Sequence, residues 1–353
     1  MNIDIYSTRE LNRFLEERLT PKRFFRNRLF RQELTHDAEH IDVDLRRGTR
    51  AVARFINPAN AAGTVNRTGF TTISLSPPHI KEQMVLTAQQ LKTRIPGEHS
   101  YSGMSPDERA AFWLGKDTEQ LDDLIGRREE LMCRDVLFDG KITISGTGIQ
   151  SYDIDYGFTN DIDLNDQGYV PWDGTGADIR KDFRTFRQLV NGKCGRTLDM
   201  AVLGADVADV LFSDETVAKF LDNRRTEIGM LKFEQNPVEG SIYHGNLWGI
   251  DLWTYDELYI DPADGTTTRE MVPANKVLFA DSRVPMTMHY GCVTFFDKDG
   301  NNQAESYAQA RVGRSWDIKD PSARIYLMES RPLPDPVAID SFVVVTALED
   351  DET

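Results

Sequence analysis

Acidic side chains gather between Asp153 and Asp166, and paired carboxylates are the residue type from which hydrolytic acid and base pairs are built. The spacing that begins at Asp161 imitates the opening of a calcium-binding loop, but its twelfth position is Trp172, where that loop needs a bidentate glutamate. A second imitation begins at Asp297 and fails in the same way, because its twelfth position is Ala308. We interpret the first stretch as a solvated acidic loop, with loose cation binding and a carboxylate-dependent hydrolase as alternatives.

A nucleophilic thiol is the other chemistry that the residue types allow. Cys292 lies three residues after His289, and Cys133 and Cys194 are far away without CxxC spacing. A buried thiol beside a structural histidine explains this pair without catalysis. No phosphate-binding GxxxxGK[ST], HExxH or GxSxG motif occurs. The sequence therefore predicts no catalytic residue, no metal site and no cofactor, and a protein that is not an enzyme.

The length, hydrophobic fraction and net charge of the chain limit the possible classes of protein. The chain has 353 residues, 40% of them hydrophobic, which suffices for about two domains with cores. A formal charge of −16 argues against a protein whose main surface coats nucleic acid. The most apolar run, Phe342 to Val345, is far too short to span a bilayer.

The stretch from Arg18 to Arg31 is basic and aromatic, and it has no acidic residue. Thr20 and Pro21 suit the N-cap and first position of a short helix. Two interpretations remain open. The arm either lies across another subunit or along nucleic acid, or it packs on its own domain with solvated arginines.

A two-stranded ribbon is predicted next. Ile41, Val43 and Leu45 alternate with polar residues, and a second alternating stretch from Thr64 to Ser76 follows turn residues. Two strands of roughly fifteen residues would reach about 50 Å and would be marginal alone. We therefore expect another part of the assembly to hold this ribbon.

A long helix begins at Ser105, where a serine cap is followed by Pro106 and by Glu108 three residues after the serine. Helical spacing of apolar residues continues to about residue 138. This length, about 45 Å, is far above the usual one and predicts a spine-like element.

A compact α+β unit is predicted over residues 177–281. It contains a helix from Ile179 that stops at Asn191-Gly192, a buried strand at Leu198 to Leu203 and further strands near Tyr255 and Ala280. Beyond Asp281 the chain returns to extended segments.

The order of these elements resembles that of the tailed-bacteriophage major capsid proteins, specifically the lambda-like capsid protein E family with the Hong Kong ninety-seven type fold. The motifs that carry the resemblance are Phe24-Phe25-Arg26, Leu29-Phe30-Arg31, Leu91 to Pro96, Tyr290-Gly291-Cys292, Ser315-Trp316, Asp320 to Arg324, and Ser330 to Pro336. The resemblance spans essentially the whole chain. It implies an α+β fold with an N-terminal arm at 1–35, an extended loop at 36–90, a peripheral domain at 91–176 with the spine helix at 106–138, an axial domain at 177–281, and return strands to the peripheral domain at 282–353.

The resemblance also implies the partners. Copies of the chain are expected to form hexamers and pentamers of an icosahedral shell, assembled in the bacterial cytoplasm with a separate scaffolding protein. Double-stranded DNA inside, a portal protein and a decoration protein are the other expected partners of such a virion. An encapsulin-type cellular compartment is the alternative with the same fold. The inter-subunit contact candidates are Arg23, Phe24, Phe25, Arg26, Phe30, Arg31, Ile41, Val43, Leu45, Phe55, Phe70, Ile73 and Leu75.

Overall fold

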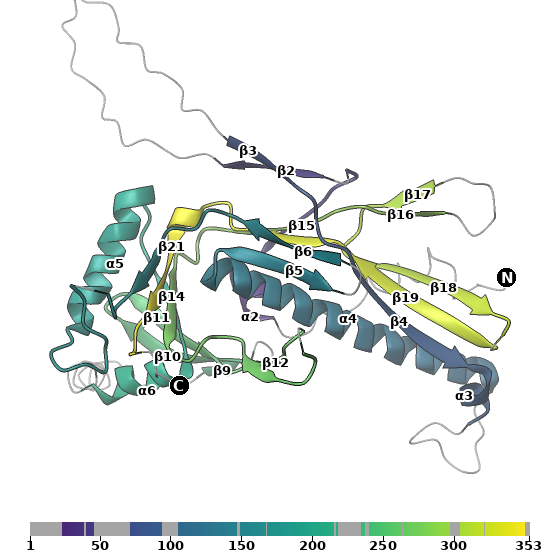
Figure 1. Cartoon of the computed structure of the whole chain (residues 1–353). Coiled ribbons are helices and arrows are strands. Elements are labelled where there is room, and N and C mark those ends of the chain that lie inside the picture. Colours follow the sequence, from purple (N-terminus) through teal and green to yellow (C-terminus); the bar gives the residue numbers. More distant parts are fainter. Residues whose placement is uncertain are drawn as a thin grey trace, which may run out of the picture.

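The computed structural model describes residues 23–38, 40–45, 71–93, 105–146, 149–166, 168–214, 217, 234–236, 240–262, 264–296, 304–320 and 322–349. Figure 1 shows a long helix running along the body, with a three-stranded sheet beside its N-terminal half and a larger mixed sheet beyond its C-terminal end. No helix in these ranges is both long enough and apolar enough to cross a membrane.

The long helix is α4 (Pro106–Phe138), with the bounds that the sequence predicted. It begins with a reciprocal capping box, in which the Glu108 N–H donates to Ser105 Oγ at 3.2 Å and the Ser105 N–H donates to Glu108 Oε2 at 2.7 Å. The buried stripe includes Leu121, Ile125 and Val136, which face the rest of the chain. The helix therefore depends on tertiary packing for its stability, as its narrow apolar face requires.

A three-stranded antiparallel sheet covers the N-terminal half of α4. Its order is β18 (Val312–Ile318), β19 (Ala323–Ser330) and β4 (Ile80–Thr87), and the one-turn helix α3 (Ala88–Lys92) follows β4. Tyr326 and Met328 of β19 pack against Leu121 and Ile125. The prediction that residues 36–90 all belong to the ribbon is therefore wrong for β4, because eight residues of this strand pair with β19 from Ile80 to Thr87.

The larger sheet has seven strands. Their spatial order is β7 (Asp161–Asp163), β21 (Phe342–Thr346), β14 (Lys276–Ala280), β8 (Met200–Leu203), β11 (Ile250–Tyr255), β10 (Ser241–Leu247) and β9 (Glu234–Asn236). Successive residues of the central strands alternate between two cores. Met200 and Val202 face the core that contains the end of α4, whereas Ala201 and Leu203 face the core of α5 (Ile179–Cys194) and α6 (Ala205–Ser213).

The domain boundaries predicted at 177 and 281 do not coincide with this sheet. β7 precedes residue 177, and β21 lies far beyond residue 281, yet both pair within the sheet. The β-branched run of β21 explains its place, since Phe342 and Val344 face one core while Val343 and Val345 face the other. A strand buried on both faces reads as a continuous apolar run and needs a central position.

The helix predicted to stop at Asn191-Gly192 continues to Cys194. Gly195 ends it in the left-handed conformation, with φ of +76°, and its N–H donates to the Asn191 carbonyl at 3.0 Å. Glycine adopts this conformation without steric cost, so the later glycine is the cap.

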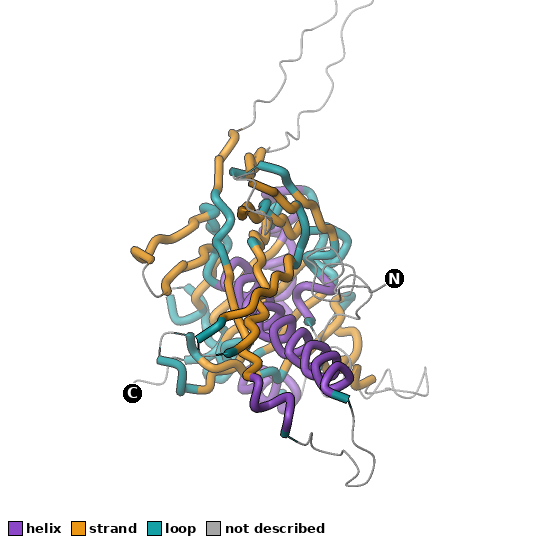
Figure 2. The backbone as a smooth tube through the Cα atoms, turned by 90° about the vertical axis from the view of Figure 1, so that its right-hand side faces the viewer, coloured by secondary structure: helices purple, strands orange, loops and turns teal. Residues whose placement is uncertain are grey.

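Four hairpins and a small sheet complete the described chain. The hairpins are β2 (Ile41–Leu45) with β3 (Thr71–Leu75), β5 (Lys141–Gly146) with β6 (Ile149–Asp155), β12 (Leu258–Ile260) with β13 (Thr268–Glu270), and β16 (Val293–Phe296) with β17 (Ala304–Tyr307). The small sheet joins β1 (Gln32–Thr35), β15 (Thr287–Tyr290) and β20 (Pro332–Asp335), and the short helix α2 (Phe24–Arg28) precedes β1. Figures 1 and 2 both show β2 and β3 extending away from the body.

Candidate assembly surfaces

The N-terminal aromatic residues pack inside the chain. Phe24, Phe25 and Phe30 have no exposed surface. The ring of Phe25 lies 5.6 Å from that of Tyr255 and 6.1 Å from that of Phe138, in edge-to-face geometry in both pairs. Such pairs add to the stabilisation that burial of the rings already provides. Helix α2 is therefore held by the same core that the end of α4 and the mixed sheet share.

Two arginines beside α2 are also buried, and they are paired with acids of α4 and with β1. Arg23 Nη1 donates to Glu129 Oε2 at 2.9 Å, and Arg26 donates to Glu33 and to the Phe30 carbonyl. Arg311 contacts both oxygens of the same Glu129, through Nη1 at 2.6 Å and Nη2 at 3.0 Å. One fully buried carboxylate thus joins the N-terminal segment, α4 and the segment before β18.

The balance of charges around Glu129 favours its ionised form. Burial alone would raise the pKa of Glu129, but the guanidinium of Arg311, with a further contribution from Arg23, outweighs it and lowers that pKa. Asp122 belongs to the same network, with Oδ1 2.8 Å from Nε of Arg311 and Oδ2 3.6 Å from Nη2 of Arg23, and removal of Glu129 would leave these buried charges with less compensation.

The neighbouring Glu130 holds the start of α2. Its Oε1 accepts the Phe25 N–H at 2.8 Å and its Oε2 accepts the Arg26 N–H at 3.1 Å. A carboxylate at this place satisfies two of the backbone donors that the first turn of a helix leaves free. Burial raises the pKa of Glu130 to about 7, although these N–H groups favour the charged form.

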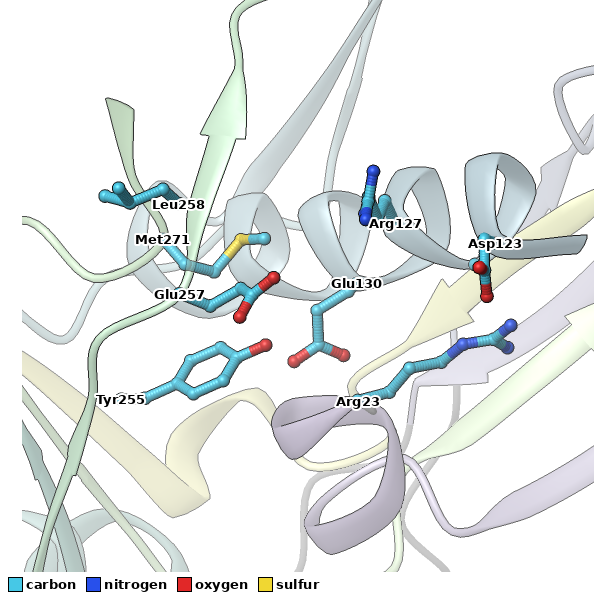
Figure 3. Close-up of a pocket in the computed structure, with 9 residues that line it drawn as sticks. Arg23, Asp123, Arg127, Glu130, Tyr255, Glu257, Leu258 and Met271 are labelled. Carbon is cyan, nitrogen blue, oxygen red and sulfur yellow. The ribbon is translucent and has the colours of Figure 1, made fainter. Parts of the chain in front are cut away.

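A cavity of about 320 Å³ lies beside Glu130. Figure 3 shows the Glu130 carboxylate between Arg23 and the hydroxyl end of Tyr255, with Glu257 close by. The guanidinium of Arg23 approaches α4 at Gly126, where an added Cβ would lie 2.1 Å from Nη2. The absence of a side chain at Gly126 therefore makes room for the buried arginine.

Five of the predicted inter-subunit contact residues pack within their own chain. Arg23, Phe24, Phe25, Arg26 and Phe30 are all buried in their own chain, so they present little surface to a neighbour. The second of our two interpretations of the arm, packing on its own domain, describes α2, but its arginines are paired rather than solvated. Arg31 is exposed, and its Nε donates to the Arg28 carbonyl at 2.8 Å.

The acidic residues of α4 that pair with the arginines beside α2 were not identified from the sequence. Glu129 and Glu130 interrupt the apolar stripe of α4 between Ile125 and Met132, on the buried side of the helix. Two adjacent acids at such a place are a signal for cations that arrive from elsewhere in the chain.

The base of the ribbon has the predicted pairing. Ile41 lies opposite Leu75, and Val43 lies opposite Ile73, in an antiparallel register. Ile41 is buried and Leu75 is half-buried, so the body anchors this base. The candidates Phe55 and Phe70 lie outside the described residues, as do the side-chain environments of Val43, Leu45 and Ile73.

Two other hairpins expose large apolar side chains. Phe296 of β16 is 75% exposed, whereas its neighbour Phe295 stacks on Tyr307 at 5.2 Å. Leu258 and Ile260 of β12 share one side of their strand and are 55% and 61% exposed. Figure 1 shows the β16–β17 hairpin reaching out from the body near β15. These exposed side chains are candidates for contact with a partner.

The carboxylates between Asp153 and Asp166 form hydrogen bonds and an ion pair within the chain. Asp155 Oδ1 accepts the Gly157 N–H at 2.7 Å, Asp163 Oδ1 accepts the Asn165 N–H at 2.9 Å, and Asp153 lies 3.8 Å from Lys141. Within the described part of the chain, no three His, Cys, Asp or Glu side chains gather as a metal site requires. The carboxylates therefore stabilise turns and strands one by one.

His289 is not oriented toward a cysteine nucleophile. Its Nδ1 lies 2.8 Å from Nε2 of His36, and its Nε2 lies 3.3 Å from Oδ2 of Asp335. Both ring nitrogens are therefore engaged by partners other than Cys292, whose side chain is buried.

Comparison with solved structures defines the class of protein first. A crystal structure assigned to the capsid protein of an Escherichia coli CFT073 prophage superposes with a TM-score of 0.66, at 19% identity, over 95% of this chain and 96% of that chain. A phage-related protein of Bordetella bronchiseptica RB50 gives a TM-score of 0.53 at 8% identity, over 96% of both chains. The fold is the α+β phage capsid fold that the sequence predicted.

The sequence comparisons then define the family. The family described as phage major capsid protein E matches residues 7–347, and the chain belongs to this family. The major capsid protein of Enterobacteria phage P21 is 22% identical over 97% of this chain and 98% of its own length. That of Escherichia phage lambda is 20% identical over 94% and 96%. The predicted phage capsid class is thereby confirmed over the encapsulin and hydrolase alternatives.

Proposed function

We propose that the chain is the main structural subunit of an icosahedral phage head that encloses double-stranded DNA. Copies of the chain associate as hexamers and pentamers, and the role of the chain is structural, without a reaction of its own. Family membership supports this proposal, and so do the exposed apolar side chains of Leu258, Ile260 and Phe296 on two hairpins.

The proposed mechanism divides the chain into a self-sufficient body and its contact elements. The body closes its own cores, including α2, around α4 and the mixed sheet. The β2–β3 and β16–β17 hairpins leave the body and supply strand edges and apolar side chains to neighbouring copies. Modest contacts become strong when they are repeated around closed rings.

The predicted segments keep their roles as proposals, with two adjustments. The ribbon role applies to the β2–β3 hairpin, and Ile41, Val43, Leu45, Ile73 and Leu75 form its base. The axial unit comprises residues 177–281 together with β7 and β21, which share its sheet. Arg31, Phe55 and Phe70 remain contact candidates.

Further partners follow from such a shell. A separate scaffolding protein, a portal protein at one vertex and a decoration protein on the outside are part of the proposal, as is assembly in the bacterial cytoplasm. Each of them would be detected as a component that copurifies with particles or with their precursors.

The observation that carries the mechanism is the exposure of the Phe296 side chain, and the test changes this residue. The variant Phe296→Asp places a charge where an apolar contact is proposed and should abolish or strongly reduce uniform particles in electron microscopy, with the subunit fold unchanged by circular dichroism. Phe296→Leu keeps an apolar side chain and should retain shells. Normal shells from Phe296→Asp would refute the contact role of this hairpin, and a chain that stays monomeric at high concentration would refute the shell itself.

A further inference from the structure

Within the described part of the chain, helix α5 (Ile179–Cys194) and the residues that flank it carry a cationic stretch of surface. Residues 178–196 contain six cationic and two acidic side chains, a formal balance of +4 in a chain whose total is −16. The cations are Arg180, Lys181, Arg184, Arg187, Lys193 and Arg196. A concentration of one sign of charge on one element indicates a surface for a partner of the opposite sign.

The helix presents Arg180, Lys181 and Arg184 to solvent. Phe183, Phe186 and Val190 occupy its buried face. Arg180, Arg184 and Arg187 follow the i, i+4, i+7 spacing of one face and span about 10 Å along the axis. Arg180, Lys181 and Arg184 are exposed, and none of the three forms an ion pair with a residue that the structure describes.

The two acids of this stretch are occupied elsewhere. Asp178 caps the helix, where its Oδ1 accepts the Lys181 N–H at 3.0 Å. Asp182 Oδ2 accepts the indole N–H of Trp172 at 3.1 Å, and burial raises the pKa of Asp182. Neither carboxylate neutralises the arginine row.

A groove of about 430 Å³ lies among these cations, with Phe183 and Trp248 in its wall. Arg187 Nη2 donates to the Trp248 carbonyl at 2.8 Å, and the rings of Phe183 and Trp248 meet edge to face at 5.1 Å. Trp248 stands in the left-handed region, with φ of +50°, in the tight turn between β10 and β11. Gly249 has a positive φ as well, of +85°, and two-residue hairpin turns favour this conformation at both central residues.

We propose that the α5 basic face, defined as Arg180, Lys181, Arg184 and Arg187, binds the phosphate backbone of double-stranded DNA. This inference rests on the proposed function of the chain as a shell around DNA. Guanidinium groups bind phosphate oxygens in a bidentate manner, and an exposed row of them needs no base contact. Contacts of this kind to the phosphate backbone are independent of base sequence.

The described arginines at the start of α2 differ from those of α5. Arg23 and Arg26, the cations that the sequence suggested for nucleic acid, are engaged with Glu129 and Glu33. The α5 basic face, by contrast, has Arg180 and Arg184 exposed and without an ion pair to a described residue. An acidic protein segment is the competing occupant, and the test below distinguishes it.

The experiment measures binding of a fluorescent 20-base-pair duplex to the full-length, unassembled chain by anisotropy over a series of salt concentrations. The triple variant Arg180→Gln, Lys181→Gln, Arg184→Gln should make the slope of log K against log salt concentration shallower by about 2.7, at about 0.9 for each lost phosphate contact. The matched control Lys116→Gln, Arg127→Gln, Arg128→Gln removes the same charge from α4 and should leave that slope nearly unchanged.

Equal losses in both triple variants, or no binding by the unaltered chain, would overturn the proposal. An unchanged slope together with failed shell formation by the α5 variant would also overturn it and would identify the face as a protein contact. Shell formation by the unaltered chain, followed by electron microscopy, tests the proposed function separately from DNA binding.

Discussion

Two stretches of this chain are rich in arginine, and their arginines have opposite surroundings. Around α2, Arg23 and Arg26 are buried and paired with acids. Along α5, Arg180 and Arg184 are exposed. The composition of the stretches is similar, so the difference comes from the elements that face them.

The facing elements differ in one property. Helix α4 presents Glu129 and Glu130 on its buried side, directly against α2. The sheet residues that pack against α5 include apolar ones such as Ala201 and Phe279, and Arg180 and Arg184 of α5 are exposed. A basic segment is therefore structural where buried acids face it, and it is free for a partner where they do not.

The largest effect is expected at the centre of the buried cluster. Glu129→Gln removes the carboxylate charge and leaves Arg23 and Arg311 without it, so the free energy of unfolding of the subunit should fall by about 3–5 kcal/mol in urea denaturation. The control Asp153→Asn removes an exposed pair with Lys141 and should cost less than about 1 kcal/mol. Similar small losses in both variants would contradict the structural role of the cluster.

A comparable loss of stability is expected when the aromatic packing of α2 is removed. Phe25→Ala removes a ring with no exposed surface and should lower the free energy of unfolding of the unassembled subunit by about 3–5 kcal/mol. If the ring were an anchor for a neighbouring copy, the isolated subunit would keep its stability and only shell formation would suffer. Chemical denaturation of dilute subunits separates these two results.

The pH dependence of stability distinguishes Glu130 from Glu129. The pKa of Glu130 is raised in the folded chain from an ordinary value of 4.5 to about 7, so the folded state holds an extra proton between these values. Its contribution to stability is therefore fully present below about pH 4.5 and is lost as the pH rises through about 7, by up to about 3 kcal/mol.

The variant Glu130→Gln isolates this contribution, since it mimics the protonated carboxyl. Relative to the unaltered chain, it should gain stability as the pH rises from 5 to 8. The measurement is the difference in the free energy of unfolding between the two proteins at each pH. A difference that does not change with pH would show that Glu130 titrates normally.

The smallest effect on stability is expected at the α5 basic face. The triple variant Arg180→Gln, Lys181→Gln, Arg184→Gln alters exposed side chains without ion pairs to described residues, and the free energy of unfolding should change by only about 0.5 kcal/mol. A loss of several kcal/mol would mean that these cations are structural like those near α2. The comparison between the two stretches would then fail.

Local signals in the sequence predicted much of the fold. The capping box at Ser105 and the spacing that follows gave α4 its correct bounds, and the alternation at Ile41 and Val43 gave the base of the ribbon. These features depend on residues that are close together in the chain. The family motifs at the two ends predicted the shell class, which the comparisons confirmed.

Contacts between distant residues were not predictable in the same way. Arg23 and Glu129 are 106 residues apart, and the basic arm gave no indication of which acids it would meet. Likewise, the run at Phe342 predicted a strand, but its partners β7 and β14 are defined only by the packing of the whole sheet. Periodicity predicts that a face is buried, not what covers it.

The most direct test of this account is hydrogen exchange of the same chain before and after assembly. The amide groups of Phe25 and Arg26 are bonded to Glu130 within the chain, so peptides covering residues 23–30 should be protected in dilute, unassembled subunits. Peptides covering the β16–β17 hairpin should gain protection only in shells. Rapid exchange of residues 23–30 in the subunit, with protection appearing on assembly, would contradict the account and return the arm to the subunit interface.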